Sequence, residues 1–399
     1  MSLELIHGRW AGRIPSPLRD VVVDVAQELA AGRRRRDEQG TASADDLGLI
    51  DRPALLGATL PAEHDGEALP TAALVEVFAT LAAADPAVTQ LLLPHFVQVR
   101  VILGLGGPEL VTQVVEEIRA GGRLSAGASE RGTPRAWVPA TRLRPGDPPT
   151  LSGRKYYATG ALTARRLGIT ALDADDRLVL AVVPADAAGL VLEADWDSFG
   201  QRATASGSVV LTDVRVDPAN VLPLWKGGDT PGVEGAFDQL LHAAIDQGIA
   251  RAALTATRDY LRDHARVWFE SEAERIVDEP EVVARFGEIA ARVIAADGAL
   301  AAAARRWDEV VAEDVTADSA ATLSIEVAAA KDATTRVAIE TANSLFELGG
   351  ASATASGHGL DWYWRNARTH TLHDPIRWKH RHIGNYALHD TRPPRHGLI

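Results

Sequence analysis

The spacing of apolar residues changes twice along this 399-residue chain, so one kind of secondary structure cannot account for all of it. Near the start, apolar residues recur every three or four positions, as in an amphipathic helix: Leu18, Val21, Val25 and Leu29. In the middle, the strings "DRLVLAVVPADAAGLVLEAD" and "SGSVVLTDVRVD" are rich in strand-forming residues and are separated by turn residues. Helical spacing then returns in one long stripe: Phe237, Leu241, Ile245, Ile249, Ala252, Ala256 and Tyr260.

This order predicts an α+β protein with three parts. We expect an N-terminal helical domain over residues 1–120, a middle β-domain over residues 121–228 and a C-terminal helical bundle over residues 229–399. The last part is rich in alanine, whose small side chain lets helices pack closely.

Composition excludes several classes of function. The chain has no cysteine, which rules out disulfides, iron–sulfur clusters, thiolate zinc sites and thiol nucleophiles. Its net charge of −13 argues against nucleic-acid binding, and the arginine run at residues 33–36 is expected to be the solvated end of a helix. The start "MSLELIHGRW" lacks the pattern of a signal peptide, and no uncharged apolar run reaches the roughly 18 residues of a membrane span. We therefore expect a cytoplasmic protein without membrane contact.

The sequence has no evident motif for a nicotinamide cofactor. The nearest string, "GLGGPE" at residues 104–109, lacks the third glycine of the dinucleotide fingerprint and lies between two predicted helices. We interpret it as a helix–helix turn. A P-loop and a GxSxG elbow are also missing, so redox chemistry in this chain would have no module of its own for NAD(P)H.

Five strings, in this order along the chain, are similar to segments of the acyl-CoA dehydrogenase superfamily. They are "GASERGT" (127–133), "LSGRKYYATGA" (151–161), "FGQRATASGSVVLTDVRVDPANVL" (199–222), "LFELGGASA" (345–353) and "YWRNARTHTLHDP" (363–375). The resemblance covers nearly the whole chain. It implies that family's fold, with a helical domain, a middle β-domain and a C-terminal four-helix bundle, and it implies a flavin.

The last string departs from the dehydrogenase pattern. Where those enzymes usually carry the glutamate that abstracts a proton from the acyl thioester, this chain has His373-Asp374-Pro375. The string "RTHTLHDP" instead resembles a branch of two-component flavin-dependent monooxygenases, typified by dibenzothiophene and alkyl-sulfone monooxygenases. That resemblance implies reduced FMN from a separate NAD(P)H-dependent flavin reductase, with FAD also possible. It further implies O2, a C4a-hydroperoxyflavin and oxygen transfer to sulfur or nitrogen of a small substrate.

The resemblance places one group of candidate residues around the flavin ring. His373 would lie at the reactive edge, where an imidazole proton suits a flavin peroxide, and Thr159 would reach the N5 region. Core filling is the alternative for Tyr157, because aromatic residues are common in strands. The residues that would line the cofactor pocket are Tyr157, Ser129, Trp196 and Ser206.

A second group is assigned by the resemblance to the flavin phosphate. Arg266 resembles the arginine that reaches the cofactor of a neighbouring subunit; a surface arginine is the alternative. Gly349 and Gly350 would let the backbone approach that phosphate, and Arg368 would assist there or form a structural ion pair. This arrangement implies a homotetramer, or at least a homodimer.

The roles of several histidines stay open. His95, in the apolar string "LLLPHFVQV", is either a core histidine or, as the resemblance implies, a catalytic residue facing the substrate. His370 and His373 are spaced as H-x-x-H, but the third ligand of a metal site is missing, so no metal is expected. His380 and His382 are expected to be exposed.

Two other functions remain as alternatives. The chain could be a true FAD-dependent acyl-CoA dehydrogenase with Asp374 as its base, or it could be a non-catalytic homologue that binds or scaffolds. Reduction of bound flavin by an acyl-CoA distinguishes the first alternative, and failure to bind flavin distinguishes the second.

Overall fold

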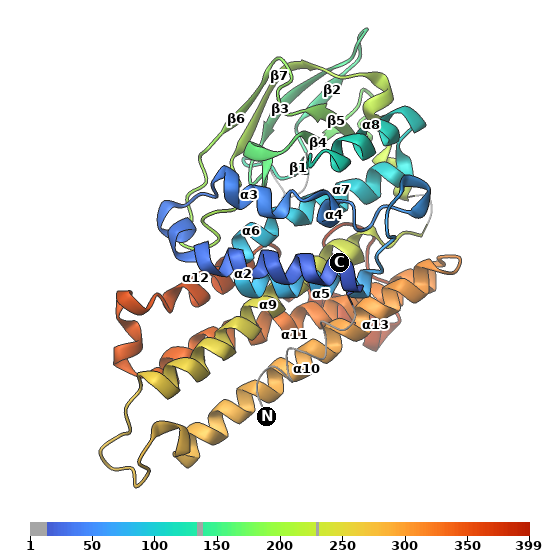
Figure 1. The fold of residues 1–399 in the computed structure, drawn as a ribbon. Coiled ribbons are helices and arrows are strands. Elements are labelled where there is room, and N and C mark those ends of the chain that lie inside the picture. Colours follow the sequence, from blue (N-terminus) through green and yellow to red (C-terminus); the bar gives the residue numbers. More distant parts are fainter. Residues whose placement is uncertain (1–13, 134–138, 229–230) are drawn as a thin grey trace.

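A computed structural model describes residues 14–133, 139–228 and 231–399, in which a sheet lies against one side of a large helical body (Figure 1). The first helices are α2 (Ser16–Gln39), α3 (Ala44–Ile50), α4 (Pro53–Leu56), α5 (Thr71–Ala84), α6 (Pro86–Gln90), α7 (Leu92–Leu105) and α8 (Pro108–Arg119). The last helices are α9 (Glu234–Asp263), α10 (Pro280–Val311), α11 (Ala317–Gly349), α12 (Asp361–His370) and α13 (Ile376–His389). The first ten residues, on which the expectation of no signal peptide rests, lie outside the described ranges.

The sheet lies between these two sets of helices in the sequence. Its strands are β1 (Leu124–Gly127), β2 (Arg142–Arg144), β3 (Thr150–Lys155), β4 (Arg166–Leu172), β5 (Leu178–Pro184), β6 (Leu190–Glu193), β7 (Ser208–Arg215) and β8 (Val221–Leu222). They pair in the order β6-β7-β3-β2-β4-β5-β8, and β1 pairs with β4. The pairing of β3 with β7 is the one that matters for the site, because it brings residues near 159 and 206 together.

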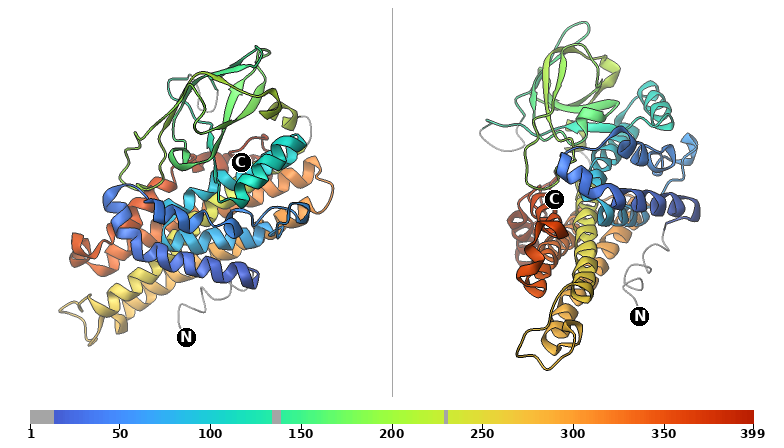
Figure 2. Two further views of the ribbon diagram at one scale, coloured as in Figure 1. Left: turned by 45° about the horizontal axis from the view of Figure 1, so that its top comes forward. Right: turned by 60° about the vertical axis from the view of Figure 1, so that its left-hand side comes forward.

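The two sets of helices share one apolar core. Helix α9 packs most extensively against α11 and α5, and Figure 2 shows α5 and α11 on opposite sides of it. Residues of α5 such as Phe78 are fully buried in the same cluster as Ile245 and Ile249 of α9. The sheet has a smaller core of its own, which includes Ile169 and Val209. The first and last sets of helices therefore share one core, although the sheet with its separate core lies between them in the sequence.

A glycine sets a close contact between α5 and α9. At Gly248 of α9, an added Cβ would lie 2.5 Å from the carbonyl oxygen of Ala79 on α5. Such a distance is far inside van der Waals contact, so a larger residue here would push α5 and α9 apart. The predicted helix–helix turn at residues 104–109 is confirmed, because α7 ends at Leu105 and α8 begins at Pro108.

The arginine run at residues 33–36 is not wholly solvated, and the prediction is wrong for its last member. Arg36 is 1% exposed and lies on the buried side of α2. Its guanidinium contacts Asp46 at 2.6 Å and Asp85 at 2.7 Å. A buried cation is tolerated when it is paired and hydrogen-bonded, which composition alone does not reveal.

The segment Pro86–Leu105, which comprises α6 and α7, is long and apolar enough to cross a membrane by length and composition alone. In the structure most of this segment is buried within the protein. A core helix of a soluble protein passes the same test, so the segment is weak evidence for a membrane.

Candidate active site

Three hydroxyl groups form a continuous chain where β3 and β7 meet. The Oγ1 of Thr159 lies 2.9 Å from the Oγ of Ser206, and Ser206 donates to the Oγ1 of Thr204 at 2.7 Å. Thr204 in turn donates to the carbonyl oxygen of Gln201 at 3.0 Å. The backbone supports this hydroxyl chain, because the N–H of Gly160 donates to the carbonyl of Thr204 at 3.0 Å. Thr159 and Ser206, both predicted from sequence as flavin neighbours, are thus in direct contact.

Two further predicted residues form an aromatic pair beside the hydroxyl chain. The rings of Tyr157 and Trp196 meet edge to face with centroids 6.1 Å apart, and the indole N–H of Trp196 donates to Gln201. Tyr157 has a φ of +58° and remains 50% exposed, so it is not a core-filling residue. Ser129 lies on the adjoining segment, and its carbonyl oxygen accepts a hydrogen bond from the N–H of Tyr156.

Helix α12 holds the loop that carries this hydroxyl chain. The N–H of Gln201 donates to the Oδ1 of Asn366 at 2.9 Å, and an added Cβ at Gly200 would lie 2.0 Å from the carbonyl oxygen of Arg365. The side-chain amide of Gln201 is buried and has no hydrogen-bond partner among the described residues. Buried amides are normally paired, so this one is a candidate contact for a bound group. His370 lies four residues after Asn366, on the same face of α12.

A cluster of ionisable side chains fills the space between α9, α11 and the end of α12. His370 is fully buried, and its Nδ1 lies 2.5 Å from Asp246 of α9. His242 lies one turn before Asp246 on α9, and its Nδ1 is 3.2 Å from the Nε2 of His370. The ring of His373 stacks on that of His242, with centroids 3.7 Å apart and planes inclined by 26°. His373 is the most exposed of the three imidazoles.

Charges around this cluster are balanced by buried ion pairs. Lys331 of α11 contacts Asp246 at 2.7 Å, and Lys379 of α13 contacts Asp374 at 3.0 Å. Burial would raise the pKa of Asp246, but Lys331 and His370 lower it to about 2. Burial is likewise outweighed at Asp374, where the hydrogen bond from His373 and nearby lysines hold the carboxyl pKa well below its ordinary value. Both carboxylates are therefore ionised at neutral pH.

The cluster also contains one carboxyl group whose pKa is raised instead of lowered. Asp238 lies one turn before His242 on α9, with its Oδ1 3.9 Å from the Nε2 of His242. Burial raises the pKa of Asp238 to about 6, although the charge of His373 lowers it. This group therefore exchanges a proton closer to neutral pH than Asp246 or Asp374 does.

Sequence reasoning missed five residues of this cluster, namely Asp238, His242, Asp246, Lys331 and Lys379. A signal was present, because the first three recur every fourth position on α9 and make one polar line along an otherwise buried helix. Lys331 gave no such signal among its alanine neighbours. His370, which was left open, is placed at the centre of the cluster. His380 is exposed as expected, whereas His382 is half-buried.

His95 has all the contacts of a core histidine. It is fully buried, its Nε2 lies 2.9 Å from the carbonyl oxygen of Leu56, and its Nδ1 accepts from the N–H of Leu124 at 3.2 Å. Burial lowers the pKa of His95 to about 4, so the ring is neutral. Both ring nitrogens are occupied by backbone groups, which favours the core alternative over a catalytic role.

The residues assigned to a flavin phosphate lie at the other end of the bundle. Tyr260 is 18 positions after His242 on α9, roughly 27 Å along the helix axis. It contacts Gly349 at the end of α11, and Arg266 follows in the exposed segment after α9. Gly350 has a φ of +67° and open space around it, as a glycine loop near a ligand requires. Arg368 does not lie in this segment; it is half-buried on α12, two positions before His370.

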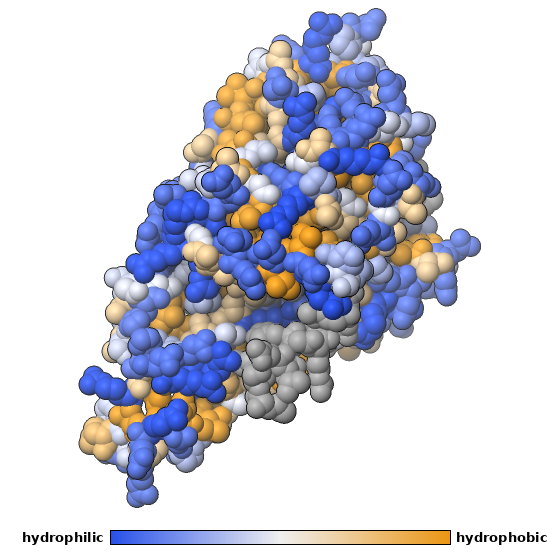
Figure 3. Space-filling model, in the orientation of Figure 1, coloured by the Kyte–Doolittle hydropathy of each residue, from blue (hydrophilic) through white to orange (hydrophobic). Residues whose placement is uncertain are grey.

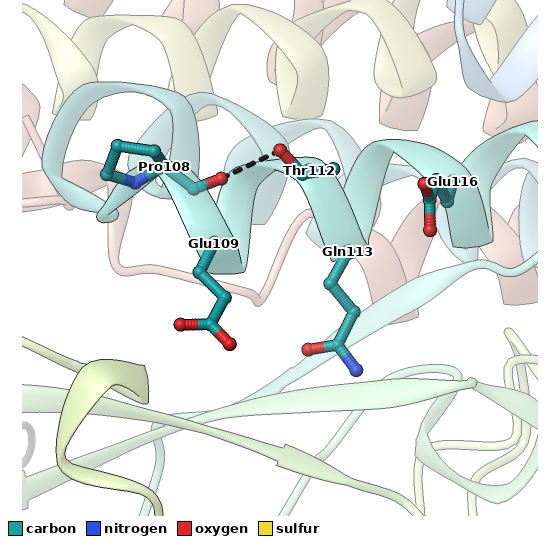
Figure 4. A pocket seen from close by; sticks show the side chains of 5 residues that line it. All are labelled: Pro108, Glu109, Thr112, Gln113 and Glu116. Carbon is teal, nitrogen blue, oxygen red and sulfur yellow. Dashed lines mark hydrogen bonds between the residues drawn. The ribbon is translucent and has the colours of Figure 1, made fainter.

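Two other features lie outside this site. A surface hollow of about 510 Å³ runs along α8, where Glu109 and Gln113 point toward the sheet (Figure 4). Its remaining lining residues are Pro108, Thr112 and Glu116, and none was predicted to be functional. Among the residues the structure describes, no group of three or more His, Asp or Glu side chains is arranged to hold a metal ion.

Comparisons with known proteins agree on one family. The family model described as "Acyl-CoA dehydrogenase, C-terminal domain" matches residues 240–378. Dibenzothiophene monooxygenase of Rhodococcus qingshengii is 27% identical over 388 residues, which cover 92% of each chain. The probable FMNH2-dependent monooxygenase SfnC of Pseudomonas putida is 35% identical over 249 residues, 61% of this chain and 63% of SfnC.

Solved structures extend this likeness to three dimensions. TdsC from Paenibacillus sp. A11-2, with FMN bound, superimposes with a TM-score of 0.91 at 30% identity, over 95% of this chain and 99% of TdsC. The complex of TdsC with FMN and indole gives a TM-score of 0.90 at 29% identity over the same shares.

Proposed function

The chain belongs to the acyl-CoA dehydrogenase superfamily, in the branch of two-component flavin-dependent monooxygenases, and we propose that its active site lies where α12 joins the hydroxyl chain to the histidine cluster. The enzyme is a flavin-dependent monooxygenase that uses FMN. The observation that carries the location is α12 itself, whose buried face contacts Gln201 through Asn366 and Asp246 through His370. A site at this junction has hydroxyl groups on one side and an imidazole on the other.

The residues present fit a reduced flavin ring at this junction. When bound, reduced FMN together with O2 supplies the oxygen-transfer chemistry. The hydroxyl groups of Thr159 and Ser206 would hydrogen-bond a polar ring edge, and the unpaired amide of Gln201 would gain a partner. The rings of Tyr157 and Trp196 would close the site against water, with Arg131 stacked on Tyr157 at 4.6 Å.

His373 is the residue to which we assign proton control. Its Nδ1 is directed to Asp374 at 3.4 Å, which leaves Nε2 as the nitrogen available to cofactor or substrate. An imidazole there would donate a hydrogen bond near neutral pH and would delay loss of the activated oxygen to water. Arg368 on α12 keeps its proposed assignment to the flavin phosphate, with a structural ion pair as the alternative.

The alternative of an acyl-CoA dehydrogenase requires Asp374 to act as a base. Its side chain is only 4% exposed and is paired with Lys379, and its carboxyl pKa is held well below the ordinary value. A carboxylate that is this strongly stabilised as an anion is a poor proton acceptor. The geometry therefore favours oxygenation over dehydrogenation.

We expect anaerobic acyl-CoA to leave the flavin of the oxidised enzyme unbleached, because Asp374 cannot take the α-proton. Absorbance of the flavin after mixing with short- and long-chain acyl-CoA measures this, with dithionite as the control that the bound flavin is reducible. Bleaching by any acyl-CoA would instead support the dehydrogenase alternative. Absence of any affinity for oxidised or reduced flavin would support the non-catalytic alternative.

The substrate is proposed to be a small organic molecule with an electron-rich sulfur, nitrogen or indole ring. The relatives in support are named for dibenzothiophene, for FMNH2-dependent oxygenation and, in one complex, for indole. We slightly favour sulfur because the "HDP" string resembles the sulfur-oxidising branch. The test is incubation with reduced FMN and O2 against thioethers, sulfones, amines and indoles, followed by mass spectrometry.

We expect one class in this panel to gain a single oxygen atom, with the second atom of O2 leaving as water. Isotopically labelled O2 should put the label into the product, and enzyme boiled beforehand is the control for oxidation by free peroxide. Catalase added to the reaction removes the same artefact. If no compound gains oxygen while reduced FMN is consumed at the rate of free flavin, the proposed activity is wrong for this chemistry.

We further propose that the enzyme is a homo-oligomer, with a tetramer as the expected state, and that a separate reductase in the cytoplasm supplies reduced FMN. Trp268 and Phe269 are 63% and 81% exposed in the segment between α9 and α10, next to Arg266. Figure 3 shows apolar surface at this end of the bundle. Exposed aromatic residues of this kind mark contact surfaces, and a neighbouring subunit there would bring Arg266 to a second cofactor.

A further inference from the structure

Three buried groups behind His373 form a directed chain of hydrogen bonds. We call Asp246, His370 and His242 the histidine chain. Asp246 also accepts from Lys331 at 2.7 Å and from the hydroxyl of Thr335 at 2.9 Å, so its carboxylate is fully satisfied as an anion. Because an ionised carboxylate only accepts, the Nδ1 of His370 must be the protonated nitrogen that faces it.

This assignment fixes the proton on the next ring. A neutral His370 that is protonated at Nδ1 carries a lone pair at Nε2, which can only accept. The Nδ1 of His242, 3.2 Å away, must therefore donate to it. His242 is left with a lone pair at its own Nε2, on the side of Asp238. One anion thus sets the tautomers of two successive imidazoles.

The surroundings keep His242 uncharged. Burial lowers its pKa well below the ordinary value, and the neighbouring cations lower it further. The groups that face the ring are His370 of α12, His373 and Asp374 after α12, Lys331 of α11, Lys379 of α13 and Asp238 of α9 itself. The positively charged members of this set repel a proton, so they oppose protonation of His242 to the cation.

A neutral ring beneath His373 has a specific consequence. The two rings stack at 3.7 Å, a distance at which two imidazolium cations would repel strongly. An uncharged aromatic face instead attracts a cation, so His373 can carry a proton without leaving the stack. The Nδ1 of His373 is meanwhile held by Asp374, so that the ring has two restraints, one on its face and one on its edge.

We propose that the histidine chain is a positioning device for His373, in which Asp246 and His370 hold His242 as a fixed, uncharged platform for the His373 ring. His242 is on this view a positioning residue, and its effect on the reaction passes through His373. The inference rests on the proposed function for its meaning, but the geometry of the His373 ring can be measured without flavin. The polar line along α9 then has a purpose that packing alone does not require, because apolar residues would fill the same space at similar stability.

Two substitutions at one position separate the ring from its hydrogen bond. His242→Phe keeps a flat ring under His373 and removes the donor to His370. His242→Asn keeps an amide donor for His370 and removes the ring. The readout is the nitrogen NMR spectrum of the flavin-free protein labelled in histidine, recorded through a pH titration. In the unaltered protein we expect His242 and His370 to stay neutral and protonated at Nδ1 throughout.

For His242→Asn we expect the His373 resonances to move to those of a freely averaging imidazole. The share of reduced FMN that yields oxygenated product should fall about tenfold, less than the roughly 10²-fold that a 1 Å misplacement of a reacting group can cost. His242→Phe should keep the His373 resonances where they are in the unaltered protein. It should also keep most of the coupling, which is the share of reduced FMN that yields oxygenated product. If it does not fold, His370→Asn tests the same chain, because it should release the His242 tautomer and shift His373 as His242→Asn does.

The proposal is overturned if the His373 resonances and the coupling are unchanged in folded His242→Asn. It is equally overturned if His242→Phe and His242→Asn shift His373 by the same amount, since the ring would then not be the platform. A protein that oxygenates no substrate, but whose His373 spectrum responds as described, would sink the proposed function and leave the positioning role standing.

Discussion

Replacement of His373 by alanine is expected to lower the rate of oxygenation by about 10²- to 10⁴-fold, the range typical for loss of a positioned acid or base. The ring is the part of the histidine cluster nearest to solvent, and among the described residues its hydrogen bond is made by Nδ1, which leaves Nε2 available. Without that donor, activated oxygen should escape as hydrogen peroxide instead of reaching the substrate. The measurement is the ratio of oxygenated product to reduced FMN consumed, together with the peroxide released.

The protein itself should survive this substitution. Asp374 keeps its ion pair with Lys379 at 3.0 Å, and the His373 side chain is 28% exposed, so no charge is left buried without a partner. His380→Ala is the matched control, because His380 is an exposed histidine on the neighbouring helix and is paired only with groups at the surface. Normal coupling in His373→Ala, with a fall in His380→Ala, would contradict the assignment.

The order of elements and the family could be predicted from sequence because both depend on local patterns. The periodicity of apolar residues reflects which face of each element is buried, and the five strings are short local patterns that can be read directly along the chain. Thr159 and Ser206 were assigned to one pocket by resemblance, and the pairing of β3 with β7 brings their hydroxyl groups together. What the sequence does not contain is the register that makes this contact.

The histidine cluster shows why the remainder could not be predicted. His370 and His373 were seen as a possible pair because they are three positions apart, yet their partner His242 lies 128 positions from His370 in the sequence. Its environment depends on how α9, α11 and α13 pack, and so does the ionisation of Asp238 and Lys379. The same limit applies to Arg36, whose charge is paired in the interior with Asp46 of α3 and with Asp85, the residue that caps α6. Tertiary packing decides these cases, and spacing along the chain does not report it.

A second buried charge cluster predicts the largest effect on stability. Arg251 of α9 contacts Glu76 of α5 at 2.9 Å and Asp297 of α10 at 2.6 Å, and all three side chains are at most 7% exposed. Arg251→Met would leave two carboxylates buried without a cation where three helices of the shared core meet. We expect a loss of about 3–5 kcal/mol in the free energy of unfolding at neutral pH, because breaking a buried ion pair costs that much.

The loss should depend on pH in a definite direction. Burial raises the pKa of both Glu76 and Asp297 even with Arg251 present, so the folded state binds protons that the unfolded state releases. Stability contributed by such groups falls as pH rises, and removal of Arg251 raises both pKa values further. The deficit of Arg251→Met should therefore shrink as the solution is made mildly acidic. Urea unfolding midpoints of the variant and the parent, measured across this pH range, test the direction.

Two further variants decide whether the buried charge is the cause. Arg34→Met removes an exposed arginine paired with Glu38 and should change stability by no more than about 0.5 kcal/mol. Adding Glu76→Gln and Asp297→Asn to Arg251→Met should recover much of the lost stability, because uncharged amides can be buried at lower cost than unpaired carboxylates. If the triple variant is as unstable as Arg251→Met, lost packing of the arginine stem would account for the effect, and the pH dependence should then be absent.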